Sequence, residues 1–116
     1  MQNFNNVFLL GNLTKDPELR YTEEGKPFVD IGLAVNRKWI NGQGEQKSSV
    51  DYMNITGWNQ LAENCANNLK KGDRVMVAAR VKYKQNEKEG KKYNIMYLNA
   101  EVVAASLEFN EISFIN

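Results

Sequence analysis

Histidine is absent from this sequence of 116 residues, and Cys65 is its only cysteine. A single cysteine leaves no intrachain disulfide, and a zinc site built from Cys and His side chains would have too few ligands. Catalysis in which a histidine activates a serine or cysteine nucleophile is excluded as well. Because Asp16, Asp30, Asp51 and Asp73 do not cluster by spacing, the sequence favours a protein that is not an enzyme and holds no metal or other cofactor.

Long hydrophobic runs and a targeting signal are missing too. The longest apolar runs, such as residues 75–79, have the length of a strand and are far too short to span a bilayer. Residues 1–5 lack the basic and apolar regions of a signal peptide. We therefore expect an intracellular, cytoplasmic protein that makes no membrane contact.

The sequence has no overall excess of one charge, since 15 Lys and Arg residues stand against 14 Asp and Glu residues and leave a net charge of +1. The distribution is uneven, because nine cations and only three acids lie between positions 70 and 92. This segment can form a local positive surface on a nearly neutral protein. It is equally compatible with a solvated strand-and-loop face that binds nothing.

Alternating apolar residues predict several strands. Within 28–36, Val29, Ile31 and Leu33 share one face, and their neighbours share the other. The predicted strands are 7–13, 28–36, 51–57, 74–84 and 92–105, with a short extended piece at 19–22. The polar segments 41–49 and 85–91 predict loops.

One segment has helical periodicity, because Leu61, Cys65 and Leu69 recur at four-residue steps within 59–69. Asn59 is the expected N-cap of this helix. The order of three strands, one helix and two strands is expected of an OB-fold barrel. We predict an all-β fold, a five-stranded OB-fold barrel with one helix between strands 3 and 4. It forms one domain over residues 1–106, followed by a short C-terminal tail, 107–116.

Four stretches have the residues and spacing of a known family. They are Asn-Val-Phe-Leu-Leu-Gly-Asn-Leu-Thr-Lys-Asp-Pro-Glu-Leu-Arg-Tyr at 6–21, Gly-Leu-Ala-Val-Asn-Arg at 32–37, Trp-Asn-Gln-Leu-Ala-Glu at 58–63 and Leu-Lys-Lys-Gly-Asp at 69–73. Together they resemble the bacterial and phage single-stranded-DNA-binding protein family over roughly residues 5 to 105. The resemblance implies an OB-fold barrel, usually a homotetramer, that binds single-stranded DNA without sequence preference during DNA replication, recombination and repair.

Such binding requires exposed rings on which bases stack. The resemblance implies stacking roles for Trp39, which lies between two cations and a loop, for Tyr52 and for Trp58. The structural alternatives are a core position for Trp39, a sheet-bracing surface role for Tyr52 and a hydrophobic plug at the barrel end for Trp58.

Tyr83 is a fourth stacking candidate, although the family aromatic lies slightly later, near Gln85 or Asn86. The alignment of Tyr83 with this family position is open, and the sequence is as compatible with a structural role for Tyr83 as with a stacking role. Tyr21 and Tyr97 are expected in the core or at a subunit interface.

A path for the phosphates requires cations, whose contacts weaken as the salt concentration rises. Lys71 matches a family position that contacts DNA. The complete set of candidates is Lys15, Arg20, Arg37, Lys38, Lys71, Lys82, Lys84 and Lys91. Two other family cation positions hold Asn54 and Gln60 here, so the DNA footprint need not equal that of familiar members.

The C-terminal residues differ from those of long family members, which carry a flexible linker and an acidic tip that recruits replication and repair proteins. Residues 107–116 contain two acids and two phenylalanines but no proline. We interpret the chain as a short form lacking the acidic tail, such as a phage, plasmid or competence-type paralogue. A truncated chain and a tail that docks on a neighbouring subunit are the alternatives.

Two other functions compete with DNA coating. One is an OB-fold adaptor of the primosome type, which acts mainly through contacts with other replication proteins. The other is a metal-dependent nuclease, which the lack of histidine does not exclude but which no carboxylate cluster supports. The rings at positions 39, 52 and 58 argue against the adaptor.

Overall fold

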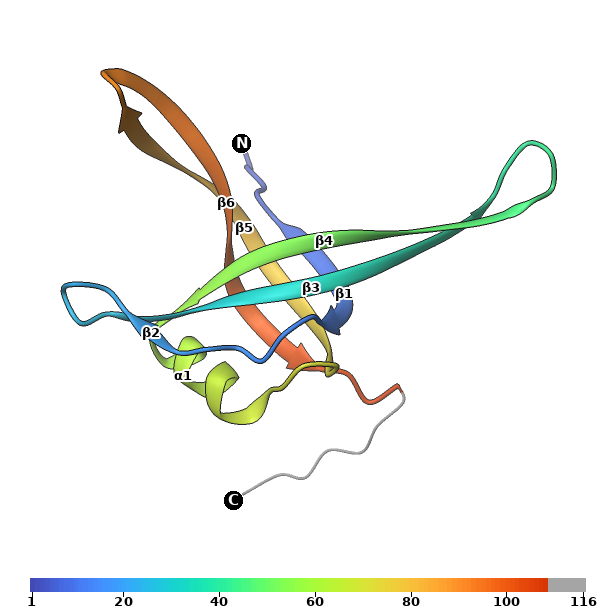
Figure 1. The fold of residues 1–116 in the computed structure, drawn as a ribbon, viewed down its shortest axis with the longest axis horizontal. Helices are drawn as coiled ribbons and strands as arrows, with labels where there is room; N and C mark the ends of the chain where they lie inside the picture. Colours follow the sequence, from blue (N-terminus) through green and yellow to red (C-terminus); the bar gives the residue numbers. More distant parts are fainter. Residues whose placement is uncertain (109–116) are drawn as a thin grey trace.

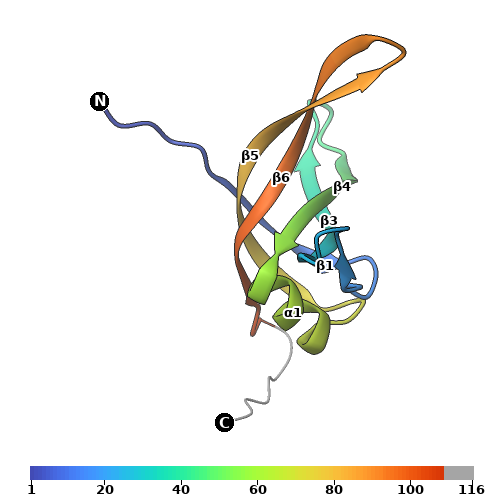
Figure 2. The ribbon, with the colours of Figure 1, turned by 90° about the vertical axis from the view of Figure 1, so that its left-hand side faces the viewer.

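The computed structural model describes residues 1–108, which form a small barrel of strands with a helix at one end (Figures 1 and 2). Two long hairpins project from this barrel in different directions (Figure 1). The elements are β1 (Val7–Leu13), β2 (Arg20–Tyr21), β3 (Pro27–Ile40), β4 (Gln46–Trp58), α1 (Asn59–Asn68), β5 (Arg74–Lys88) and β6 (Lys91–Ala105).

The five long strands close into a ring. β1 pairs with β5 and with β3, β5 pairs with β6, and β3 pairs with β4, all antiparallel. A parallel contact between β4 and β6, with Ile55 beside Leu98, completes the ring. The two-residue β2 adds only to the edge of β3. The predicted five-stranded OB-fold barrel with one helix before its last two strands is confirmed.

Aliphatic side chains from alternate positions fill the interior. The largest of the fully buried side chains are those of Val29, Ile31, Leu33, Ile55, Val75 and Val77. On α1, Ala62 and Cys65 join the same core. Burial raises the pKa of the Cys65 thiol, so this residue is a neutral core side chain at physiological pH.

Barrel closure requires a glycine where β1 passes from β5 to β3. A Cβ atom at Gly11 would collide with the carbonyl oxygen of Ala34 on β3. Only glycine permits such a close approach of two backbones without moving one of them. The short distance lets Asn12 pair with both neighbouring strands.

Both hairpins are longer than the sequence indicates. Pairing of β3 with β4 continues to Ile40 and Gln46, and pairing of β5 with β6 continues to Lys88 and Lys91. The predicted loops are therefore too long, because backbone hydrogen bonds hold polar ribbons together without apolar side chains. The side chain of Asn41 closes the β3–β4 turn by accepting two backbone hydrogen bonds, of 2.9 and 3.0 Å.

The start of the helix also differs from the prediction. The N-cap position is Trp58, not Asn59, and no side chain caps the helix there. Asn59 instead adopts a φ of 58°, a left-handed conformation that asparagine tolerates better than most residues. α1 therefore begins immediately where β4 ends, which fixes Trp58 at a sharp turn between strand and helix.

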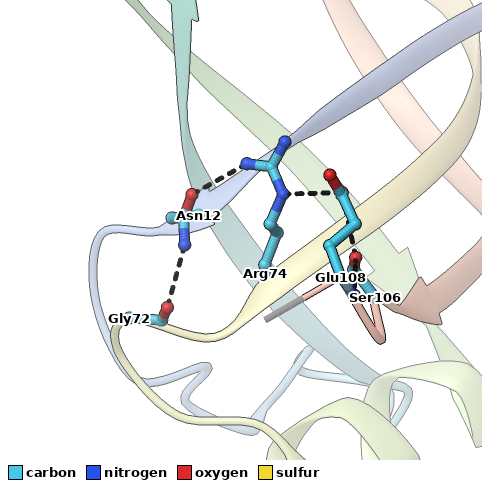
Figure 3. A network of polar contacts seen from close by, with 5 residues as sticks. All are labelled: Asn12, Gly72, Arg74, Ser106 and Glu108. Atoms are coloured by element: carbon cyan, nitrogen blue, oxygen red, sulfur yellow. Dashed lines mark hydrogen bonds and ion pairs between the residues drawn. The ribbon is translucent and has the colours of Figure 1, made fainter. Parts of the chain in front are cut away.

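A polar network ties the last described residues to the barrel (Figure 3). Arg74 donates hydrogen bonds to Glu108 (2.8 Å) and to Asn12 (3.1 Å), and the Ser106 hydroxyl donates to Glu108 at 3.0 Å. The hydrogen bond from Arg74 holds the pKa of Glu108 below its ordinary value, and the hydrogen bond from Ser106 lowers this pKa to a lesser extent. The remainder of the predicted tail, 109–116, lies outside the described residues.

Candidate nucleic-acid interface

The β3–β4 ribbon has two distinct faces. Its register is unbroken from Phe28 opposite Trp58 to Ile40 opposite Gln46, so side chains alternate strictly between the faces. We call the face of Val29, Ile31 and Ile55 the inner face, because it fills the barrel or continues from its interior. We call the opposite face, with Phe28, Asp30, Tyr52, Thr56 and Trp58, the outer face.

A cleft of about 390 Å³ lies on the outer face. Its walls come from the segment before β3, from β3 and β4, and from β5 and β6. The lining residues are Thr22, Phe28, Asp30, Thr56, Trp58, Lys84 and Tyr97. We call it the outer cleft. In OB folds, oligonucleotides bind to the face of the second and third long strands and to the loops beside it, and those strands are β3 and β4 here.

Trp58 stands in the outer cleft as a half-buried ring. The Phe28 ring supports it, with ring centroids 5.4 Å apart and planes tilted by 37°. The ammonium group of Lys26 lies 4.5 Å from the Trp58 ring centroid. The ring is thus held by neighbours on the surface of the barrel, and it is not among the core residues.

Tyr52 occupies the same outer face, further along β4. Its side chain is 73% exposed, so the ring is open to solvent. Nearby, the aliphatic part of Lys15 passes over Gly32, which faces Asn54 across the ribbon. The outer face therefore brings Lys15 close to the line that joins Tyr52 and Trp58.

Trp39 lies on the inner face, in the part of the ribbon that projects from the barrel. The guanidinium of Arg37 lies 5.0 Å from its ring centroid, and Lys47 is its cross-strand neighbour. Strict alternation places this ring on the face opposite Tyr52 and Trp58. The structure therefore does not bring Trp39 into one row with the other two rings.

Tyr83 lies on the second hairpin. It pairs with Met96 two positions beyond the Val81–Leu98 pair, so it continues the interior face of the barrel. Its side chain is 67% exposed. The four predicted stacking residues thus form two groups, with Tyr52 and Trp58 outside and Trp39 and Tyr83 on the inward-facing sides of two different hairpins.

All eight cations predicted to contact phosphates are exposed. Lys84 lines the outer cleft, with its ammonium 5.8 Å from the Tyr97 ring, and Lys82 pairs with Tyr97 on the same face. Arg20 forms an ion pair with Glu18 at 3.5 Å. Arg37 and Lys38 lie on the first projecting hairpin, and Lys91 lies at the end of the second.

Lys71 approaches the loop after β1. Its backbone N–H donates a 2.7 Å hydrogen bond to Asp16, the residue after Lys15. Lys15, Arg20 and Lys84 therefore lie around the barrel part of the outer face, and Lys71 lies after α1 beside the loop that follows β1. The remaining candidates are spread along β5 and the hairpins.

Three residues of this candidate interface were not predicted from the sequence, namely Lys26, Phe28 and Tyr97. Phe28 could have been predicted, because alternation along the strand points its side chain to the face opposite that of the buried Val29. Tyr97, expected in the core or at an interface, is half-buried and lines the outer cleft. Its contribution and that of Lys26 depend on strand pairing that a linear pattern does not reveal.

Two features of the described residues bear on other roles. Within residues 1–108, no three Cys, His, Asp or Glu side chains come together as metal ligands. The same residues contain no helix of sufficient length and hydrophobicity to cross a membrane.

The sequence has close relatives among known proteins. Residues 4–109 match the single-strand binding protein family. Single-stranded DNA-binding protein 3 of Listeria innocua is 45% identical over 108 residues, which are 92% of this chain and 64% of that protein. The single-stranded DNA-binding protein of Caldanaerobacter subterraneus is 40% identical over 108 residues, 92% of this chain and 68% of that protein. The chain spans 59–64% of the length of the Listeria innocua protein and two Bacillus relatives.

Solved structures share the fold. The crystal structure of a deletion mutant of the single-stranded DNA binding protein from Thermus aquaticus has a TM-score of 0.80 and 30% identity, over 91% of this chain and 52% of that chain. The Plasmodium falciparum SSB complex with ssDNA has a TM-score of 0.77 and 20% identity, over 91% of this chain and 97% of that chain. At this identity the likeness shows only a shared fold. From the family match over most of its length and the shared barrel, this chain belongs to the single-strand binding protein family.

Proposed function

We propose that this protein binds single-stranded DNA without sequence preference, by stacking bases on its rings and pairing phosphates with Lys and Arg. The observation that carries the proposal is the outer cleft, where Phe28, Trp58 and Tyr97 lie beside the ammonium groups of Lys26 and Lys84. Every base has a π-face, so stacking accepts any sequence. The names of the Listeria and Caldanaerobacter relatives support this function over the adaptor hypothesis.

The bound strand follows the outer face from Trp58 toward Tyr52, with Lys15, Arg20, Lys71 and Lys84 near its phosphates. Lys82 extends this set along β5. A DNA strand that also reaches Trp39 and Tyr83 crosses the edge of a hairpin, where Arg37, Lys38 and Lys91 contact further phosphates. Two groups of rings on opposite faces thus suit a strand that wraps around the protein rather than one that lies straight along it.

The proposal is tested by fluorescence anisotropy of a labelled dT strand at several salt concentrations. Binding should be strong at low salt, and log K should fall linearly with log salt, by about 0.7 for each phosphate contact. Lys84→Ala should reduce this slope by about 0.7, whereas Lys70→Ala, on the turn after α1, should leave it unchanged. Absence of binding at low salt would contradict the proposed function.

We further propose a homotetramer assembled through an apolar face of β1, β5 and β6. Leu10 pairs with Met76, and Phe8 pairs with Ala78, which in turn pairs with Val102. The side chains of Phe8, Leu10, Met76 and Val102 are all exposed in the single chain. Contiguous exposed apolar surface of this kind marks protein–protein contacts.

Light-scattering mass measurement tests this assembly directly. The unmodified protein should have the mass of four chains, and a bound dT strand should add only its own mass. Phe8→Glu should reduce the mass, because it places a charge in the apolar contact. Ile40→Glu, on the projecting hairpin, should not. A monomeric mass for the unmodified protein would overturn the homotetramer.

In this role the protein acts by binding alone and performs no catalysis. Coating and protecting single strands serves DNA replication, recombination and repair in the cytoplasm, at the nucleoid or, for a phage-encoded chain, in the host cell. Proteins of replication and recombination are the proposed partners.

A further inference from the structure

The outer cleft contains one carboxylate, which neither base stacking nor phosphate contacts explain. Asp30 lies on β3, two residues after Phe28 and directly opposite Thr56. It lines the same cleft as Trp58 and Lys84. The side chain is half-buried, and within residues 1–108 it makes no hydrogen bond or ion pair. An acceptor that has lost part of its solvent without gaining a donor is free to receive one from a ligand.

The charges around Asp30 do not favour a phosphate at this point. On its other side lies a cavity of about 100 Å³, lined by Lys15, Arg20, Asp16 and Glu18 together with Asp30. Arg20 pairs with Glu18 at 3.5 Å, and neither cation comes within 4.0 Å of the Asp30 carboxylate. Among the residues that line this small cavity, three carboxylates outnumber two cations, so a phosphate is disfavoured next to Asp30 itself. Lys15, Arg20 and Lys84 remain free to contact phosphates further from this carboxylate. The part of a nucleotide that can approach Asp30 is the edge of a base.

Bases differ in what they offer to a carboxylate. Cytosine presents an exocyclic amino group as a donor, whereas thymine presents a carbonyl oxygen at the matching position, and Asp and Glu are suited to accept from that amino group. Residues rise about 3.3 Å each along a strand, so Asp30 lies about 6.6 Å from Phe28 along β3. Because Phe28 faces Trp58, a base stacked on Trp58 can direct one edge along β3 toward this carboxylate.

We propose that Asp30 accepts a hydrogen bond from the exocyclic amino group of a cytosine stacked on Trp58. The outer cleft then favours cytosine over thymine at one base position within otherwise sequence-independent binding. Lys26, beside the Trp58 ring, and Lys84, beside the Tyr97 ring, pair with the flanking phosphates. This inference rests on the proposed DNA-binding function of the same cleft.

The test compares two strands of equal length at neutral pH, one of dT alone and one in which dC alternates with dT. Their affinities are measured by competition for the unmodified protein and for Asp30→Ala. Asp30→Ala should lower the ratio of the affinity for the dC-containing strand to that for dT by about tenfold or more, as expected for loss of one hydrogen bond to a charged group. A dC-containing strand whose cytosines carry two methyl groups on N4 should show the same loss with the unmodified protein.

Asp51→Asn is the matched control, because Asp51 lies on the inner face of the same ribbon and its removal deletes the same charge. It should raise the affinity for both strands equally and leave their ratio unchanged. An unchanged ratio for Asp30→Ala, with both strands still bound, would overturn the role of Asp30 and leave the proposed function intact. Failure of the unmodified protein to bind either strand would instead overturn the proposed function, and the role of Asp30 with it.

Discussion

The two tryptophans of this chain lie on one ribbon, in different surroundings. Trp58 belongs to the part of the ribbon that closes the barrel, where Phe28 supports its ring and β6 pairs with β4 close by. Trp39 belongs to the projecting part, where Arg37 stacks on its ring and Lys47 lies opposite. The two rings also point to opposite faces.

From this difference we infer that the Trp58 ring is the more fixed of the two and the Trp39 ring the more adjustable. A ring held by its neighbours loses little freedom when a base stacks on it. Ordering a mobile side chain at an interface costs about 0.5–1.5 kcal/mol. We infer that, in the proposed interface, the barrel part supplies contacts that are already in place, whereas the hairpin part adapts to the path of the DNA strand.

The largest expected effect tests the rigidity of the barrel part. Gly11→Ala should lower the free energy of unfolding by about 1–3 kcal/mol, as overpacking does, because the new Cβ would collide with the backbone of β3. Gly42→Ala, in the hairpin turn, meets no atom within 4 Å and should change little. Urea denaturation measures both variants, and equal effects would contradict the distinction between the two parts.

Trp58→Ala should affect binding and stability together. Loss of one base-stacking platform should weaken binding of a dT strand by about 1–3 kcal/mol. Loss of the Phe28 contact should lower the free energy of unfolding by about 0.5–1.5 kcal/mol. Titration with dT and urea denaturation test the two effects, and Trp58→Phe should recover most of both. Full binding by the alanine variant would show that Trp58 is only a structural plug.

Trp39→Ala should affect binding alone. We expect weaker dT binding by about 1 kcal/mol and a change in the free energy of unfolding below about 0.5 kcal/mol, as for most surface substitutions. The same two measurements apply, with Trp39→Phe as the variant that keeps a ring. A marked loss of stability would mean that the hairpin ring is as firmly held as Trp58.

The smallest effect concerns the network at the end of β6. Because Arg74 holds the pKa of Glu108 below its ordinary value, the carboxylate stabilises the fold. This contribution is fully present above the ordinary pKa of glutamate and is lost as the pH falls through the lower folded-state pKa. Glu108→Gln should therefore be slightly less stable at neutral pH and no less stable in acid. A deficit that persists in acid would contradict this cause.

The sequence predicts the barrel well, because the barrel depends on local alternation. Val29, Ile31 and Leu33 are buried as their spacing indicates, and the helix packs Ala62 and Cys65 into the core. The hairpin lengths could not be predicted, since the polar residues that extend β3 and β5 carry no hydrophobic pattern. The inner position of Trp39 follows only once β3 is known to continue past residue 36.

The candidate site was predictable only in part, for reasons of long-range pairing. Alternation along β4 places Tyr52 on the outer face, as expected. Tyr97 joins Trp58 because β6 runs parallel to β4, a contact between distant segments. Between Ala100 and Val102 the register of β6 shifts relative to β5, which moves the core-facing positions from one alternate set to the other. No local sequence pattern marks that shift.

The most direct test of base stacking in the outer cleft uses Trp39→Phe, which leaves Trp58 as the sole tryptophan. Addition of a dT strand at low salt should quench the emission of Trp58, and added salt should restore it as the strand dissociates. Unchanged Trp58 emission, while anisotropy shows that the same strand is bound, would contradict the account.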